Sequence, residues 1–136
     1  MKVKKIVSND GVILALVVKK QNTRSMNFVT EESFPLQLGI NRYARGSKIR
    51  PHVHNRIKRI IDLSQEMVYV ERGKAEVYFY DAQGKEVDRE ILRSGDLVFF
   101  ASGGHGFDIL AETKIIEVKQ GPFHGTEKEK KFLDCV

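Results

Sequence analysis

Three histidines and one glutamate are the residues of this sequence whose types and spacing could carry chemistry. His52 and His54 are separated by a single valine in the segment GSKIRPHVH, residues 46–54. Side chains two positions apart on a β-strand project from the same face, so a strand here would place both imidazoles side by side. Such a pair suits either a metal ion or a pocket that handles protons, and two exposed imidazoles are the alternative.

Glu66 and His105 could join this pair. Glu66 begins the segment EMVYVERG, where it alternates in phase with Val68 and Val70 and is a candidate inward-facing carboxylate. His105 lies in the turn segment SGGHGF, whose glycines allow a close approach of the backbone. Three nitrogen ligands and one oxygen ligand suit Zn, Fe, Mn, Ni or Cu. The candidate catalytic residues and the candidate metal ligands are therefore the same four: His52, His54, Glu66 and His105.

Alternation of apolar and polar residues dominates the chain and predicts strands. No window of a dozen residues has a convincing helical pattern, and the best candidate, residues 55–65, is predicted to be an irregular excursion or a single turn. Short strands separated by tight turns indicate an antiparallel all-β sandwich or barrel. The predicted strands span residues 12–18, 36–44, 66–73, 74–81, 89–100 and 113–120.

The bulk composition indicates one globular domain. With 136 residues, 41% of them hydrophobic, the chain has room for one core, expected at about residues 12–120, and for a peripheral tail at 124–136. No apolar run approaches the roughly 20 residues needed to cross a bilayer, and we expect no signal peptide and no membrane partner. The single cysteine, Cys135, can form no internal disulfide. The expected compartment is the cytoplasm.

The net charge of +5 makes nucleic acid a partner to consider. The sequence has no basic helix and no strand motif of the kind that binds RNA, and its basic residues look scattered along the chain. We therefore predict no nucleic-acid partner. A modest positive surplus matches an anionic small molecule, such as a phosphate or a sugar nucleotide.

Two segments resemble the motifs of the cupin superfamily. Gly46, His52 and His54, followed by Glu66 and Gly73, have the spacing of the first cupin motif, apart from an insertion. In residues 95–105, Gly95-Asp96 opens a strand that a turn and His105 follow, which resembles the second motif. The resemblance implies the cupin double-stranded β-helix, an antiparallel jelly-roll barrel. It is most similar to a small single-domain group of cupin fold metalloproteins associated with surface-polysaccharide and nucleotide-sugar pathways.

The insertion separates His54 from Glu66 by eleven residues, where the cupin motif usually has three or four. We expect residues 55–65 to form a flap over the mouth of the pocket. Its basic residues, Arg56, Lys58 and Arg59, could pair with a phosphate, or they form a solvated loop.

Further polar residues could line the same pocket. Gln37, Asn41 and Tyr43 share one phase of the predicted strand 36–44 and could bind a sugar-like ligand, or they face outward. Glu117 and Lys119 face inward only if the last predicted strand has that phase. Both questions stay open at the level of sequence.

Three functions remain from these observations. The first is a metal-binding cupin enzyme that isomerises or epimerises a sugar or nucleotide-sugar with a divalent transition metal. The second is a metal-free ketoisomerase or epimerase in which histidines act as acid and base. The third is a cupin that binds a small ligand without turnover. We also predict a homodimer through the apolar segment VILALVV at 12–18, unless that segment is a core strand.

Overall fold

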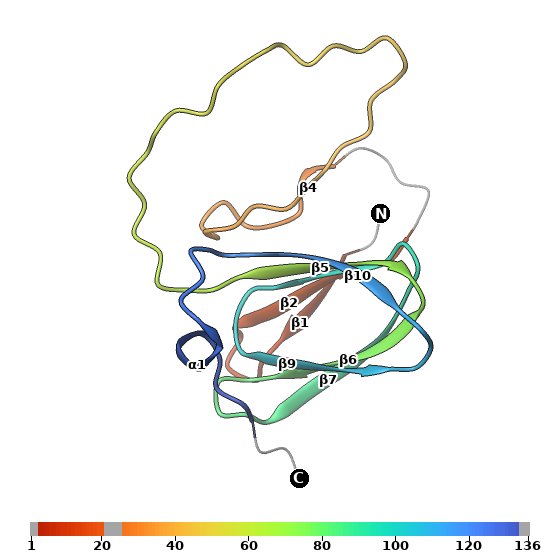
Figure 1. Ribbon diagram of the computed structural model, residues 1–136, viewed down its shortest axis with the longest axis vertical. Coiled ribbons are helices and arrows are strands. Elements are labelled where there is room, and N and C mark those ends of the chain that lie inside the picture. Colours follow the sequence, from red (N-terminus) through yellow and green to blue (C-terminus); the bar gives the residue numbers. More distant parts are fainter. Residues whose placement is uncertain (1–2, 21–25, 134–136) are drawn as a thin grey trace.

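The computed structural model describes residues 3–20 and 26–133, which form an all-β domain (Figure 1). Cys135 lies outside the described residues. Within them, helix α1 is a single turn, and no helix has the length and apolar character that crossing a membrane requires. The elements are β1 (Val3–Val7), β2 (Ile13–Val18), β3 (Met26–Phe28), β4 (Gly39–Ile40), β5 (Glu66–Arg72), β6 (Lys74–Tyr80), β7 (Glu86–Arg93), β8 (Leu97–Phe100), β9 (Gly104–Ile109), β10 (Lys114–Lys119) and α1 (Thr126–Glu129).

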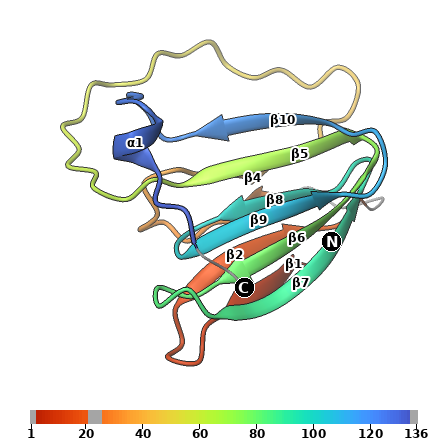
Figure 2. The same cartoon turned by 60° about the horizontal axis from the view of Figure 1, so that its bottom comes forward.

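Two larger sheets face each other, and every strand pair is antiparallel (Figure 2). The first sheet has the order β1-β2-β8-β5-β10, and the second has the order β7-β6-β9. Strands β3 and β4 form a small separate pair. Neither large sheet closes on itself, so β1 and β10 are edge strands of the first sheet. The prediction of an antiparallel all-β fold is confirmed.

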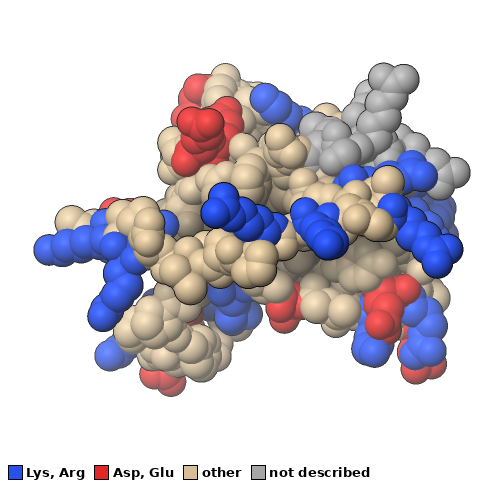
Figure 3. Space-filling model, turned by 90° about the horizontal axis from the view of Figure 1, so that it is seen from above, with Lys and Arg blue, Asp and Glu red and all other residues tan. Residues whose placement is uncertain are grey.

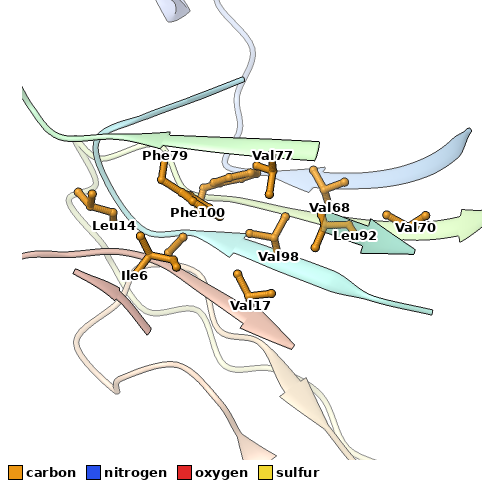
Figure 4. Close-up of a cluster of buried hydrophobic side chains, with 11 residues drawn as sticks. Ile6, Leu14, Val17, Val68, Val70, Val77, Phe79, Leu92, Val98 and Phe100 are labelled. Atoms are coloured by element: carbon orange, nitrogen blue, oxygen red, sulfur yellow. The ribbon is translucent and has the colours of Figure 1, made fainter. Parts of the chain in front are cut away.

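The core lies between the two large sheets because their inward phases are apolar. Val68 and Val70 of β5 face this space from one sheet, and Val77 and Phe79 of β6 face it from the other (Figure 4). Removing these side chains from water is the main stabilising contribution to the packing of the two sheets. The buried members of this core are Ile6, Leu14, Ala15, Val17, Val68, Val70, Val77, Phe79, Leu92, Val98 and Phe100.

The outer face of the first sheet is covered as well. Leu16 and Phe99 form a second cluster there, against which the segment before the long connection packs, with Phe34 stacked on Phe99 at 6.0 Å between ring centres. Strand β2 is therefore buried on both faces, and this explains the uninterrupted apolar run at residues 12–18. That run is a core strand in one chain. The homodimer stays a prediction, but it needs another surface.

The predicted strand at residues 36–44 is mostly wrong. Only Gly39–Ile40 forms a strand, paired with β3, and Asn41 and Tyr43 lie in an exposed irregular segment. Gln37 instead closes a local turn, because its side-chain amide donates to the carbonyl oxygens of Phe34, at 2.8 Å, and Glu31, at 2.9 Å. The strand phase expected to unite Gln37, Asn41 and Tyr43 in a pocket is therefore not formed.

Residues 41–64 form a long exposed connection between β4 and β5, which we call the arm. Every residue of the arm is exposed, and none belongs to a helix or a strand. In Figure 1 the arm leaves the sheets as a wide arc. Of the two predictions for residues 55–65, an irregular excursion or a single turn, the irregular excursion is observed. It begins earlier and includes the His52–His54 segment, which is not a strand.

Gly73 permits a close contact that no other residue could make. It turns β5 into β6 at a φ of +111°, and an added Cβ would lie 2.4 Å from Thr113 Oγ1 and 2.5 Å from the carbonyl oxygen of Glu112. We expect Gly73→Ala to lower the free energy of unfolding by about 3 kcal/mol, because it adds a clash with backbone to an unfavourable φ. Chemical denaturation measures this loss.

Gly46 provides the matched control. Its φ of +87° is also positive, but nothing lies within 4 Å of an added Cβ. Gly46→Ala should therefore cost only the backbone strain, about 1 kcal/mol. Equal losses in the two variants would contradict the close packing at Gly73.

Candidate functional site

Strands β5 and β10 place two carboxylates and a lysine on the inner face of the first sheet. Glu66 shares the phase of the buried Val68 and Val70, and its side chain is 18% exposed, so the predicted inward orientation is confirmed. In the register of β10 on β5, Lys119 lies opposite Glu66, and Glu117 lies opposite Val68. Cross-strand partners share a face of a sheet, which places Glu117 and Lys119 inward as well and answers the question that the sequence left open.

His105 reaches the same place from the opposite sheet. It lies on β9 opposite Phe79, rather than in a loop as its glycine-rich segment predicts. Its ring stacks on Phe100 of β8, with 3.6 Å between ring centres and 12° between planes. The alternation of His105 with Phe107, which packs on the core, is the signal that could have revealed this strand.

The two predicted residues Glu66 and His105 therefore meet at one end of the sandwich. His105 Nε2 lies 3.6 Å from Glu66 Oε2, which is beyond the upper limit of about 3.2 Å for a good N–H···O hydrogen bond. Glu117 lies close enough to hydrogen-bond the carboxyl of Glu66. We call Glu66, Glu117 and His105 the acid–base cluster.

Burial makes Glu66 easier to protonate. The loss of hydration raises the pKa of its carboxyl above the ordinary value, and the charge and hydrogen bond of Glu117 raise it further. The positive charges of Lys119 and Lys130 oppose this shift. The nearby carboxylate of Glu117 therefore makes ionisation of Glu66 less favourable.

Burial has the opposite effect on His105, because its charged form is the protonated one. The loss of hydration lowers the pKa of the imidazole to about 4, and the charge of Lys130 contributes in the same direction, against a smaller opposing effect of Glu117. His105 is therefore neutral at neutral pH. Its approach to Glu66 is a contact between a neutral ring and a carboxyl, and not a salt bridge.

Residues near the C-terminus supply positive charge at this end. The helix α1 lies near the ends of β5 and β10 (Figure 2), and Lys130 follows it directly. Lys119 places its Nζ 5.1 Å from the ring centre of Phe123. Sequence reasoning missed Lys130, because only the folded tail brings it near Glu66 and His105.

Gln65 fixes the start of β5 next to Glu66. It is fully buried, its Oε1 accepts from the backbone N–H of Leu36 at 3.2 Å, and its Nε2 donates to the carbonyl oxygen of Ala101 at 3.2 Å. Its backbone carbonyl accepts from the N–H of Gln120 at 2.8 Å. A buried amide satisfied on both ends is a rigid attachment point.

An open hollow of about 440 Å³ lies between the base of the arm and the C-terminal tail. Ser64, Gln120 and His124 are among its lining residues. Glu66 and His105 do not line the hollow, which begins one residue beyond the Glu66–Lys119 pair. Among the described residues, Gln120 Oε1 is a buried side-chain atom without a hydrogen-bond partner.

His52 and His54 do not join the acid–base cluster in this structure. Both are exposed on the arm, their ring centres are 5.3 Å apart, and His52 Nδ1 lies 2.8 Å from the carbonyl oxygen of Arg50. In the part of the chain that the structure describes, no three His, Cys, Asp or Glu side chains are grouped so that they could hold a metal ion. The predicted ligand set is thus divided between arm and body, and the divalent metal stays a prediction.

The basic residues expected in a flap also lie on the arm. Arg56, Lys58 and Arg59 are exposed, and they border a second, shallow hollow within the arm itself. The base of the arm does border the larger hollow, through residues 61–64. Pairing of these cations with a phosphate stays a prediction.

The fold and the site define a class: an antiparallel all-β sandwich with a carboxyl pair and a neutral imidazole at one end. A family model described as "Domain of unknown function (DUF6016)" matches residues 19–92, which is more than half of the chain. The chain belongs to this family. The matched residues include the arm and Glu66 and end before His105. No curated protein and no solved structure matches the chain.

Proposed function

We propose that the chain is a small cupin-type enzyme that isomerises or epimerises a sugar or nucleotide-sugar by proton transfer. The single observation that carries this proposal is the approach of Glu66 to His105 at 3.6 Å, with the carboxyl pKa raised and the imidazole neutral. Groups whose environments shift their pKa values in this way are typical of sites that move protons.

The residues have complementary roles in such a reaction. Isomerisation and epimerisation of a keto sugar both remove a proton from the carbon next to the carbonyl group. Glu66 is the base, because a raised pKa brings its proton affinity closer to neutral pH. His105 keeps its own proton and donates a hydrogen bond to the carbonyl oxygen, as neutral imidazoles do beside carboxylate bases in sugar-phosphate isomerases.

The surroundings support an anionic substrate. Lys119 and Lys130 bring positive charge to the end of the sandwich that holds the cluster, which suits a phosphate or diphosphate group. A hollow of about 440 Å³, within the range of small-molecule sites, begins at Gln120, next to Lys119.

The cupin jelly roll is the finer fold that we propose for this all-β sandwich. Two facing antiparallel sheets support it, as does the position of Glu66 and His105 at one end between them. The motif spacing of Gly46, Glu66 and Gly73 adds the sequence resemblance.

Deuterium exchange tests the proposed chemistry without requiring net conversion. The purified protein is incubated in D₂O with a panel of keto nucleotide-sugars and sugar phosphates, and deuterium at the carbon next to the carbonyl is followed by NMR. We expect Glu66→Gln to reduce the exchange rate by about 10²- to 10⁴-fold, the usual contribution of a general base. Glu71→Gln is the matched control, because Glu71 lies on the same strand, is exposed and pairs with Lys114.

The remaining outcomes separate the three functions. Exchange that persists after treatment with a chelator supports proton transfer by the cluster alone. Loss of exchange on chelation would overturn that proposal in favour of the metal-dependent enzyme. Tight binding of a panel member without exchange would instead support a ligand-binding protein.

A further inference from the structure

The arm carries the whole positive surplus of the protein. Seven of the basic residues and one of the acidic residues lie in residues 41–64, so the arm has a formal charge of +6, whereas the rest of the chain has a charge of −1. Figure 3 looks onto the molecule from above, the side from which the arm projects, and shows Lys and Arg side chains spread across this face. The basic residues of the arm are Arg42, Arg45, Lys48, Arg50, Arg56, Lys58 and Arg59.

The arm also exposes large apolar side chains. Val53 is 85% exposed and Ile60 is 92% exposed, and Ile49 and Ile57 are exposed as well. Hydrogen bonds within the arm include the one from the N–H of Ser47 to the carbonyl oxygen of Ala44 and the contact of His52 Nδ1 with the carbonyl oxygen of Arg50. Exposed aliphatic groups on a segment this long indicate a surface that a partner covers.

Strand β10 offers the matching surface on the body. It is an edge strand, all of its residues are exposed, and Ile115, Ile116 and Val118 present apolar side chains. The N–H of Gln120 donates to the carbonyl oxygen of Gln65, so these two residues form a hydrogen-bonded pair of the β10–β5 ladder. Hydrogen-bonded pairs occur at every second residue, and the backbone N–H and C=O groups of Glu117 and Lys119 therefore point away from β5, towards the free side of β10. An edge of this kind is ready to pair with an added strand.

The segment from Lys48 to His54 has the pattern of such a strand. Ile49, Pro51 and Val53 occupy one phase, and Arg50, His52 and His54 occupy the other. Proline is tolerated in a strand at a sheet edge, where one of its sides needs no partner. The segment can therefore form the strand that its alternation predicts if it pairs with the edge of a sheet.

We infer that two copies of this chain exchange arms, so that the arm of one copy lies along β10 of the other and brings His52 and His54 to its acid–base cluster. This inference rests on the proposed function in one respect, because it takes the acid–base cluster to be the functional site. Glu117 and Lys119 belong to both surfaces, because β10 is at once the free edge and a wall of the site.

The length of the arm permits exchange between copies. His52 and His54 lie at its middle, and about eleven extended residues at 3.3–3.6 Å each can carry them up to about 40 Å from either anchor. Reciprocal exchange of the arm for the β10 edge closes with two-fold symmetry and covers both surfaces in each copy.

Light scattering on the full chain tests the assembly. At micromolar concentration we expect the mass of two 15.5-kDa chains. Val118→Lys places a charge on the edge strand outside the acid–base cluster, and we expect it to raise the dimer dissociation constant by at least about tenfold. Val12→Lys is the matched control, because Val12 is 46% exposed and Val118 is 48% exposed. A monomeric wild type, or a dimer unaffected by Val118→Lys, overturns the inference.

A mixed sample tests whether the arm reaches the other copy. Chains with Cys135→Ser and Val53→Cys carry a nitroxide on residue 53 and no isotope label, and they are mixed with ¹⁵N-labelled chains without a nitroxide. We expect broadening of the amide signals of Gly106 and Glu117 in the labelled chains. Broadening only when both labels share a chain would show that the arm folds onto its own body, and this would overturn the exchange. Neither experiment depends on turnover, so failure of the proposed function leaves both results interpretable.

Discussion

Replacing Phe100 with alanine is expected to lower the free energy of unfolding by about 3–5 kcal/mol, the range for a buried phenylalanine. The ring is buried in the core, with its centre 6.1 Å from that of Phe79 and 6.0 Å from that of Phe107. Small domains have a total stability of about 5–15 kcal/mol, so this single change should remove much of it. Thermal and urea denaturation measure the loss.

Phe28→Ala is the control for this prediction. Phe28 is an exposed phenylalanine on β3, and its replacement should change the stability by no more than about 0.5 kcal/mol. Similar losses in the two variants would show that Phe100 is not a core residue.

Phe100→Leu separates the role in the core from the role beside His105. Leucine keeps much of the apolar volume and the variant should remain folded, but the flat ring on which His105 stacks is gone. Water then reaches the imidazole, and the pKa of His105 should rise from about 4 towards its ordinary value of 6.5. An NMR titration of the histidine ring protons measures this, and an unchanged pKa would show that Phe100 does not shield the ring.

Acidification from pH 6.5 to pH 4 is expected to destabilise the folded chain through His105. In the unfolded chain the imidazole binds a proton near pH 6.5, but in the folded chain it does so only near pH 4. Between these values the unfolded state binds more protons, so the free energy of unfolding falls as the pH falls. The contribution is fully present above pH 6.5, and its loss levels off below pH 4.

The size of this effect follows from the pKa difference. At 1.36 kcal/mol for each pKa unit the loss is at most about 3 kcal/mol, and partial exposure of the ring reduces it to about 2 kcal/mol. Urea denaturation at pH 7 and pH 4.5 should show this difference between wild type and His105→Gln, which cannot titrate. His124→Gln, in the exposed tail, should behave as the wild type does, and a loss of the same size there would contradict the assignment to His105.

Glu66 has the opposite effect on the pH dependence of the free energy of unfolding. Its pKa is raised by folding, so above its ordinary value of 4.5 the folded state binds more protons than the unfolded state, and stability falls as the pH rises. Glu66→Gln should therefore stabilise the protein at pH 8 and have less effect at pH 4. A gain in stability together with a loss of proton exchange would identify Glu66 as a residue kept for function.

The position of Glu66 could be predicted because the information is local. Its alternation with two valines sets the phase of β5, and a strand of that phase in an all-β domain has one side on which valines are buried. The same reasoning identified β2 as apolar. Alternation could not show whether β2 is a core strand or part of a dimer interface, because the residues that cover Leu16 come from the distant segment around Phe34.

The position of His105 on a strand was harder to predict. Three glycines around it obscure the alternation that β9 follows, and glycine is uncommon in strands. Glu117 and Lys119 raised a different difficulty, since Ile115 and Ile116 adjoin and both phases of β10 contain an apolar residue. Only the register of β10 on β5 assigns the inner face.

The strand expected around His52 and His54 failed for a third reason. Alternation sets which side chains share a face, but a strand also needs a neighbour for its backbone groups. This segment has no strand neighbour among the described residues, although its sequence keeps the alternating pattern.

Gln65 has a consequence for how this protein can change in evolution. Its side chain is bonded at both ends to distant backbone, immediately between the arm and Glu66. Insertions or deletions before Gln65 should therefore leave the position of β5 unchanged. Descendants of this chain could lengthen, shorten or alter the preceding segment while inheriting an undisturbed arrangement of Glu66 and His105.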